Sequence, residues 1–313
     1  YAISLGLVGS EMCIRDRICG VIAECGRPIP VYNDKHFAYR WDDASWMYET
    51  ARQLKVPLWA GSALPVSWRQ PNWEHPLGAP IDEALAIGFH MPERYGFHAL
   101  ESMQCQIERR QGSETGVCAV QCLSGEAVWK SAKEGRWSWA LAEHALRAIE
   151  HGPGELEPQK VEDPHVYLID YNDGLKAAVL MLGDNGYVRK YAYAARCGQQ
   201  VKALEYHTES GPAHSLFGYL GLNIEDFFLS GTPPRPVERT YLTTGILEAA
   251  MISRGQGGRR GAQRRVDGPR RTARRDLTVP GSSDLHRRAV EGTQARQLRP
   301  GAGPYARLQL DSA

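Results

Sequence analysis

The sequence lacks any apolar run long enough to cross a bilayer as a helix, although 42% of its 313 residues are hydrophobic. Its opening segment is apolar, but no basic residue precedes it, which is atypical of a secretory signal peptide. Eight Trp and fourteen Tyr supply enough large side chains for a packed core. We therefore expect a soluble, cytoplasmic protein without a membrane partner.

Paired cysteines are also missing. The seven cysteines are scattered through the chain, and no two are spaced as Cys-x-x-Cys. This spacing favours neither a structural zinc site nor a disulfide framework. Buried, reduced thiols are the ordinary alternative, and they agree with a cytoplasmic protein.

Lysine is absent from the last part of the chain. Residues 255–313 contain thirteen Arg and five Asp or Glu, a net charge of +8, so the remainder of this +1 chain carries −7. Clustered Arg can neutralise nucleic-acid phosphates, but the segment has almost no aromatic residues for base stacking and no periodicity. Its Arg-, Gly-, Ala- and Pro-rich composition is typical of a G/C-rich gene translated out of frame after about residue 260, and a native disordered tail is the alternative. We expect no nucleic-acid partner.

The beginning of the chain also departs from ordinary protein sequence. Residues 7–17, LVGSEMCIRDR, resemble a translated transposase sequencing adaptor. We therefore interpret residues 1–17 as a non-native segment and expect that the natural sequence before residue 18 is missing. On this interpretation the evolved protein lies between about residues 18 and 260.

The first evolved segment has the order strand, helix, strand. Residues 27–32 are β-prone, and residues 57–60 begin a second apolar strand. Between them, Asp42 or Asp43 can cap a helix whose apolar side chains recur at i, i+4 and i+7. This is the spacing of a parallel crossover, which cannot form a complete sheet alone. We interpret residues 18–66 as the C-terminal remnant of a Rossmann-like domain.

Residues 67–254 predict an α+β domain for substrate binding and oligomerisation. A Trp-, Pro- and Gly-rich loop spans 67–80, and helices are expected at 97–110 and 239–254. The expected strands are 117–128, 166–171, 175–182, 188–195 and 201–207. Tight turns such as Asn172-Asp173-Gly174 join them, so the sheet should be mostly antiparallel. The predicted fold is an α/β remnant, the last βαβ crossover of a Rossmann-like domain, followed by a large, mostly antiparallel open sheet, with residues 255–313 as a disordered tail.

Several motifs occur in an order that resembles a known family. Residues 26–68 are similar to the last crossover of the nucleotide-binding domain in the Gfo/Idh/MocA family, which includes glucose–fructose oxidoreductase and inositol dehydrogenase. Asn33-Asp34-Lys35-His36 stands where that family has Glu-Lys-Pro. The segment 96–101, GFHALE, resembles its Gly-x-His-x-x-Asp signature, and 231–234, GTPP, resembles the loop before its final helix. The resemblance covers nearly all of residues 18–260.

The resemblance implies an NAD- or NADP-dependent oxidoreductase that acts on a carbohydrate-like or polyol-like alcohol. It implies that Lys35 orients the nicotinamide and binds the substrate hydroxyl, with Asp34 beside it in the cofactor site. It also implies that His98 carries the proton and that Glu101 orients His98 or contacts the substrate. The ordinary alternatives are a surface lysine in a loop and a histidine packed at a helix start.

The sequence departs from the family pattern within or next to the motifs that carry the resemblance. His36 replaces a proline, Asp34 is one methylene shorter than the usual Glu, and Arg94 stands where the family often has an acid. The sequence contains no Gly-x-Gly-x-x-Gly turn, so no cradle for a dinucleotide pyrophosphate is evident. We therefore expect the chain as given to bind a dinucleotide poorly and to be inactive.

Two other functions stay open at this point. His90, His98 and Glu101, with Glu74-His75, could supply metal ligands for an isomerase or hydrolase, but their spacing matches no known metal motif and we predict no metal site. Alternatively, the chain is a non-catalytic binding or oligomerisation protein. Residues 166–171 have apolar side chains on both faces of the expected strand, which indicates a sheet covered on both sides and favours a homo-oligomer formed through the antiparallel sheet.

Overall fold

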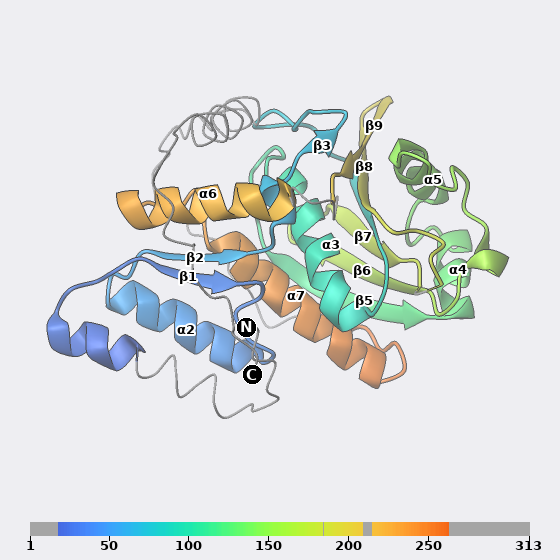
Figure 1. Ribbon diagram of the computed structural model, residues 1–313. Helices are drawn as coiled ribbons and strands as arrows, with labels where there is room; N and C mark the ends of the chain where they lie inside the picture. Colours follow the sequence, from blue (N-terminus) through green and yellow to red (C-terminus); the bar gives the residue numbers. More distant parts are fainter. Residues whose placement is uncertain (1–17, 184, 209–214, 263–313) are drawn as a thin grey trace, which may run out of the picture. The chain divides into compact units, whose positions relative to one another are not determined.

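Two β-sheets organise the part of the chain that the computed structural model describes, which is residues 18–183, 185–208 and 215–262 (Figure 1). All of these residues belong to one compact unit. The adaptor-like residues 1–17 and residues 263–313 of the Arg-rich tail lie outside the described residues, so the expectations for them stay predictions. Among the described helices, none combines the length and the apolar character that crossing a membrane requires.

The smaller sheet is the predicted crossover. Strands β1 (Val31–Asp34) and β2 (Leu58–Gly61) pair in parallel, with Val31 opposite Leu58, and helix α2 (Trp41–Gln53) connects them. The expectation that an aspartate caps this helix is wrong, because Asp42 and Asp43 lie inside its first turn. In that first turn, the two carboxylates interact favourably with the positive end of the helix dipole.

The larger sheet has eight strands, and every neighbouring pair is antiparallel except β4 with β7. In spatial order the strands are β10 (Gly261–Ala262), β5 (Val117–Ser124), β6 (His165–Tyr171), β7 (Lys176–Met181), β4 (Glu83–Gly88), β8 (Tyr191–Cys197), β9 (Gln200–Tyr206) and β3 (Arg69–Gln70). The mostly antiparallel sheet predicted from the sequence is therefore present. Its edge strand β10 extends the sheet past residue 254, where we expected the domain to end.

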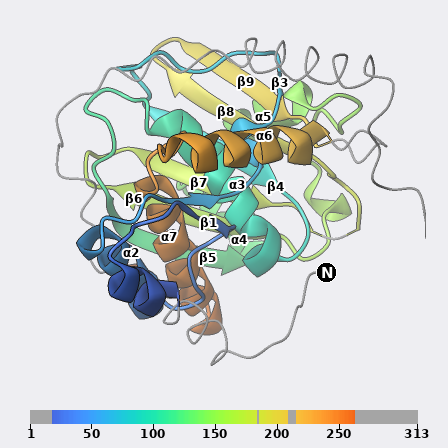
Figure 2. The same cartoon turned by 60° about the vertical axis from the view of Figure 1, so that its left-hand side comes forward.

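Helices of the same chain cover both faces of this sheet (Figure 1, Figure 2). Helices α3 (Pro92–Ile107) and α7 (Glu238–Gly255) pack on one face, and α4 (Glu126–Lys133) and α5 (Trp139–Ala148) pack on the other. Along β6, Tyr167 and Ile169 belong to the first core, whereas Val166 and Leu168 belong to the second. The two-sided burial predicted from this strand thus needs no second subunit, and the homo-oligomer stays a prediction.

Several elements differ from the expectation. Strand β5 ends at Ser124 rather than at residue 128, because Gly125 turns the chain at φ +60° into α4. Helix α3 begins at Pro92, five residues before its expected start, with proline at the first helical position, where its missing N–H costs no hydrogen bond. Strand β4, helices α4 and α5, and helix α6 (Ser215–Ser230) were not expected at all.

Candidate functional site

The two parallel strands end at the same edge, and Lys35 follows directly after the first of them. Lys35 adopts a left-handed conformation at φ +70°, and its backbone N–H donates to the Gly61 carbonyl at 3.1 Å. The Lys35 ammonium pairs with the carboxylate of Asp34, and both side chains are more than half exposed. Asn33 Nδ2 donates to the His36 carbonyl at 2.9 Å and closes this turn. The sequence DKH therefore presents a charged pair at the carboxyl end of a parallel sheet, where ligands commonly bind.

His98 reaches the end of the second strand from helix α3. Its Nδ1 lies 2.7 Å from Ser62 Oγ, the side chain that directly follows β2. Ser62 Oγ also accepts a hydrogen bond from the Leu64 backbone N–H at 3.2 Å. A serine oxygen has two acceptor lone pairs and one hydrogen, so Ser62 can either donate to Nδ1 or accept from it. Only the second arrangement leaves His98 Nε2 with a lone pair.

His98 is held in its neutral form. Burial lowers its pKa to about 4, and the positive charge of Lys35 acts in the same direction. The carboxylate of Asp34 opposes this shift but does not reverse it. The influence of Lys35 on the pKa shows that the two predicted residues lie in one electrostatic environment. A neutral imidazole at pH 7 can accept a proton, although the imidazolium that results is costly in this place.

Glu101 is buried, and its carboxylate is hydrogen-bonded to helix α7 and to the backbone that follows β2. Its carboxylate accepts from Thr243 Oγ1 at 2.6 Å and from Thr240 Oγ1 at 3.4 Å, both on helix α7. It also accepts from the Ser62 backbone N–H at 3.4 Å. Burial raises the pKa of Glu101, while the nearby Arg239 and the hydrogen bonds from Thr243 and Ser62 counteract part of that shift.

The spacing of three residues on one helix thus brings His98 and Glu101 to the same serine. His98 contacts the Ser62 hydroxyl, and Glu101 contacts its backbone amide. Glu101 is 1% exposed, so its carboxylate is enclosed by protein rather than open to a substrate. The hydrogen-bond partner of His98 is therefore Ser62 and not Glu101, which differs from the orienting role that the family resemblance implies.

The backbone at the end of β2 is fitted closely to this network. Gly61 has a φ of +140°, and a Cβ on it would lie 2.9 Å from both Glu101 Oε2 and Thr240 Oγ1. Such a distance is shorter than a real Cβ contact, so only glycine fits beside the carboxylate. Ser62, Thr240 and Thr243 were not predicted from the sequence; the position of Ser62 directly after a buried strand was the one available indication.

The residues considered for a metal site have other partners. Glu74 pairs with Arg69, Arg109 and Arg235, which together neutralise its carboxylate. His75 Nε2 lies 3.1 Å from the Tyr193 hydroxyl, and burial lowers the pKa of His75 to about 4. Within the described ranges, no group of three or more His, Cys, Asp or Glu side chains is placed to hold a metal ion.

Comparisons with known proteins give a fold rather than a sequence match. No known family pattern matches the sequence, and no curated protein matches it either. Among solved structures, GenD2 from gentamicin A biosynthesis, in complex with NAD, is similar with a TM-score of 0.51 and 13% identity, over 80% of this chain and 75% of that one. A probable dehydrogenase from Thermotoga maritima is similar with a TM-score of 0.50 and 11% identity, over 79% and 77%. The chain therefore shares its fold with these two proteins.

Proposed function

We propose that this chain contributes the substrate side of a nicotinamide-dependent dehydrogenase that oxidises a sugar-like or polyol-like alcohol. The observation that carries the proposal is the position of Lys35 and His98, which come from separate elements to the carboxyl ends of β1 and β2. The shared fold with GenD2, which holds NAD, and with a probable dehydrogenase supports it.

The roles follow from the chemistry of the side chains. The Lys35 ammonium, exposed and held next to Asp34, would donate to the oxygen of the alcohol and stabilise charge that develops there. His98 would take the hydroxyl proton at Nε2, while Ser62 accepts from Nδ1–H and fixes the ring. Glu101 would act through Ser62 as a positioning residue, because its carboxylate holds the Ser62 amide from inside the protein.

The residues present fit one end of a nicotinamide cofactor and not the other. The chemistry that such a cofactor supplies is acceptance of a hydride from the alcohol carbon. Lys35, beside Asp34 at the strand ends, is suited to hold the nicotinamide end. The sequence offers no glycine-rich turn for the pyrophosphate, so we expect the chain alone to bind NAD weakly.

The experiment is therefore designed to separate substrate binding from turnover. Saturation-transfer NMR with a panel of polyols and monosaccharides would report binding to the chain without cofactor. Absorbance of the reduced nicotinamide, with NAD and NADP each added in large excess, would report hydride transfer. We expect at least one polyol to bind, and we expect His98→Asn and Lys35→Met each to weaken that binding.

The matched control is His144→Asn, which changes an exposed histidine on α5, the helix on the opposite face of the large sheet. It should leave both signals unchanged. The ¹⁵N shifts of His98 add a readout that does not depend on turnover, because they show which ring nitrogen carries the proton. Polyol binding that survives both site substitutions, or no polyol binding at all, would overturn the proposal.

A further inference from the structure

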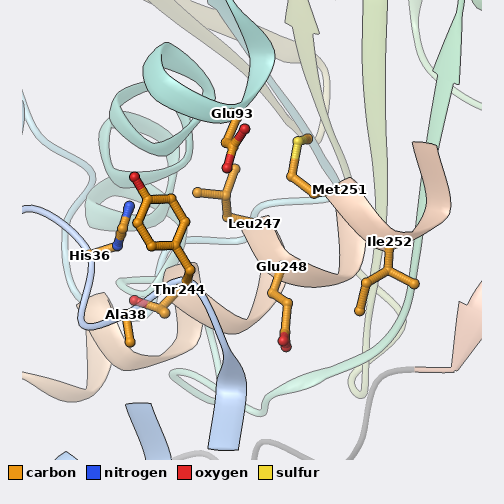
Figure 3. A pocket seen from close by; sticks show the side chains of 9 residues that line it. His36, Ala38, Glu93, Thr244, Leu247, Glu248, Met251 and Ile252 are labelled. Atoms are coloured by element: carbon orange, nitrogen blue, oxygen red, sulfur yellow. The ribbon is translucent and has the colours of Figure 1, made fainter. Parts of the chain in front are cut away.

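A depression lies beside the Lys35 turn and has a volume of about 340 Å³. Its walls come from three segments that are distant in the sequence: the turn after β1, the first turn of α3, and residues 244–252 of α7 (Figure 3). The lining residues are His36, Ala38, Tyr39, Glu93, Thr244, Leu247, Glu248, Met251 and Ile252. This volume suits a molecule about the size of a monosaccharide or a small aromatic compound.

The charged side chains that line this pocket are all acidic. Glu93 and Glu248 are its two carboxylates, and the lining includes neither Lys nor Arg. One oxygen of Glu248 accepts from the Trp41 backbone N–H at 3.0 Å, so this carboxylate caps helix α2. Within the described part of the chain, neither Glu93 nor Glu248 forms an ion pair with a basic side chain. The charged side chains of the pocket are therefore both acidic, and His36, Tyr39 and Thr244 add uncharged polar atoms.

The remaining surface of the pocket is largely apolar or aromatic. Leu247 and Met251 form one wall from helix α7, and Ile252 at its end is 52% exposed (Figure 3). Tyr39 is 62% exposed and packs edge-on against His36. An exposed aromatic ring next to carboxylates is the setting in which organic cations bind, since ring faces and carboxylates both attract positive charge.

We propose that this pocket binds a small organic cation, a primary ammonium group attached to an apolar or aromatic body. The negative charges of Glu93 and Glu248 would attract the ammonium, and the body would rest on Leu247 and Met251. The lining of the pocket includes none of Lys35, Ser62 and His98. The site is independent of the dehydrogenase proposal and can hold or fail without it.

Benzylammonium is a suitable probe, because neutral benzyl alcohol and anionic benzoate have nearly the same shape. Titration of the chain followed by ¹H–¹⁵N NMR would give the affinity of each compound and the residues that respond. We expect benzylammonium to bind in the millimolar range or better, with shifts at Glu93 and along residues 244–252. Benzyl alcohol should bind at least fivefold more weakly, and benzoate should not bind.

Variants assign the binding to the two carboxylates. Glu93→Gln and Glu248→Gln should each weaken benzylammonium binding about fivefold, as expected for partly exposed charges. Glutamine at 248 keeps an oxygen acceptor for Trp41, so the fold should persist, and the NMR spectrum checks this. Glu126→Gln is the control, since Glu126 also lies in the first turn of a helix but outside the pocket. Equal binding of benzyl alcohol, or unchanged affinity in both pocket variants, would overturn the assignment.

Discussion

Acidification should destabilise this protein through His98, and the size of the effect follows from its surroundings. Burial and Lys35 hold the pKa of His98 at about 4 in the folded chain, against about 6.5 in an unfolded one. The unfolded state therefore binds a proton before the folded state does, so stability is lost as the pH falls below about 6.5. Each pKa unit corresponds to about 1.4 kcal/mol, and between about pH 7.5 and about pH 4.5 the loss from His98 amounts to about 2.5 kcal/mol.

Urea unfolding at both pH values, followed by circular dichroism, measures this contribution. His98→Asn removes the titrating ring and leaves a side-chain amide that can still reach Ser62. When the pH is lowered, the unfolding free energy of the variant should fall by about 2.5 kcal/mol less than that of the unsubstituted chain. His75, whose pKa burial also lowers to about 4, contributes to both proteins and cancels in the difference.

His144→Asn is the control, because this exposed histidine should change neither value of the unfolding free energy. The reasoning would be refuted if His98→Asn and the unsubstituted chain lost the same unfolding free energy on acidification. In that case His98 would be open to water in solution, and the enclosed, neutral proton acceptor on which the proposed chemistry depends would not exist.

Three further outcomes test the packing around the site by urea unfolding. Gly61→Ala should lower the unfolding free energy by about 2 kcal/mol or more, whereas Gly218→Ala, on a helix with open space at the Cβ, should be neutral or stabilising. Thr243→Val should cost about 1–3 kcal/mol, because a buried carboxylate loses its hydrogen bond of 2.6 Å. Arg239→Met should cost about 3–5 kcal/mol by leaving the Glu108 carboxylate unpaired, and adding Glu108→Leu should recover much of that loss.

The parts of the fold that could be predicted from the sequence are those that local chemistry determines. In the hairpin of β6 and β7, Asp173 Oδ1 accepts from the Leu175 amide at 3.2 Å and Gly174 takes a φ of +90°, as the residue types demand. The crossover of β1, α2 and β2 was predicted for the same reason, since its helix and strands have separate periodicities.

Other elements depend on contacts that no local pattern contains. The β4 sequence EALAIG is equally compatible with a helix. It becomes a strand because β7 and β8 pair with it on either side. The start of α2 is capped by Glu248, more than two hundred residues away, rather than by the aspartates in its own first turn. Ser62 could not be assigned a role, because its partners His98 and Glu101 arrive from α3 only in the folded chain.

The same long-range contacts favour the proposed positioning role of Glu101. Its carboxylate is enclosed and bonded on one side by two threonines of α7, and on the other side by the amide that follows β2. A group that exchanged a proton with a substrate would have to break this network in every cycle, whereas a group that holds two elements together must keep it. His98 and Lys35 are linked to the protein by fewer bonds and differ in exposure, with the imidazole enclosed and the ammonium in solvent. An enclosed neutral acceptor and an exposed cation together suit the proposed removal of a proton from a hydroxyl, and Glu101 holds the serine that contacts the imidazole.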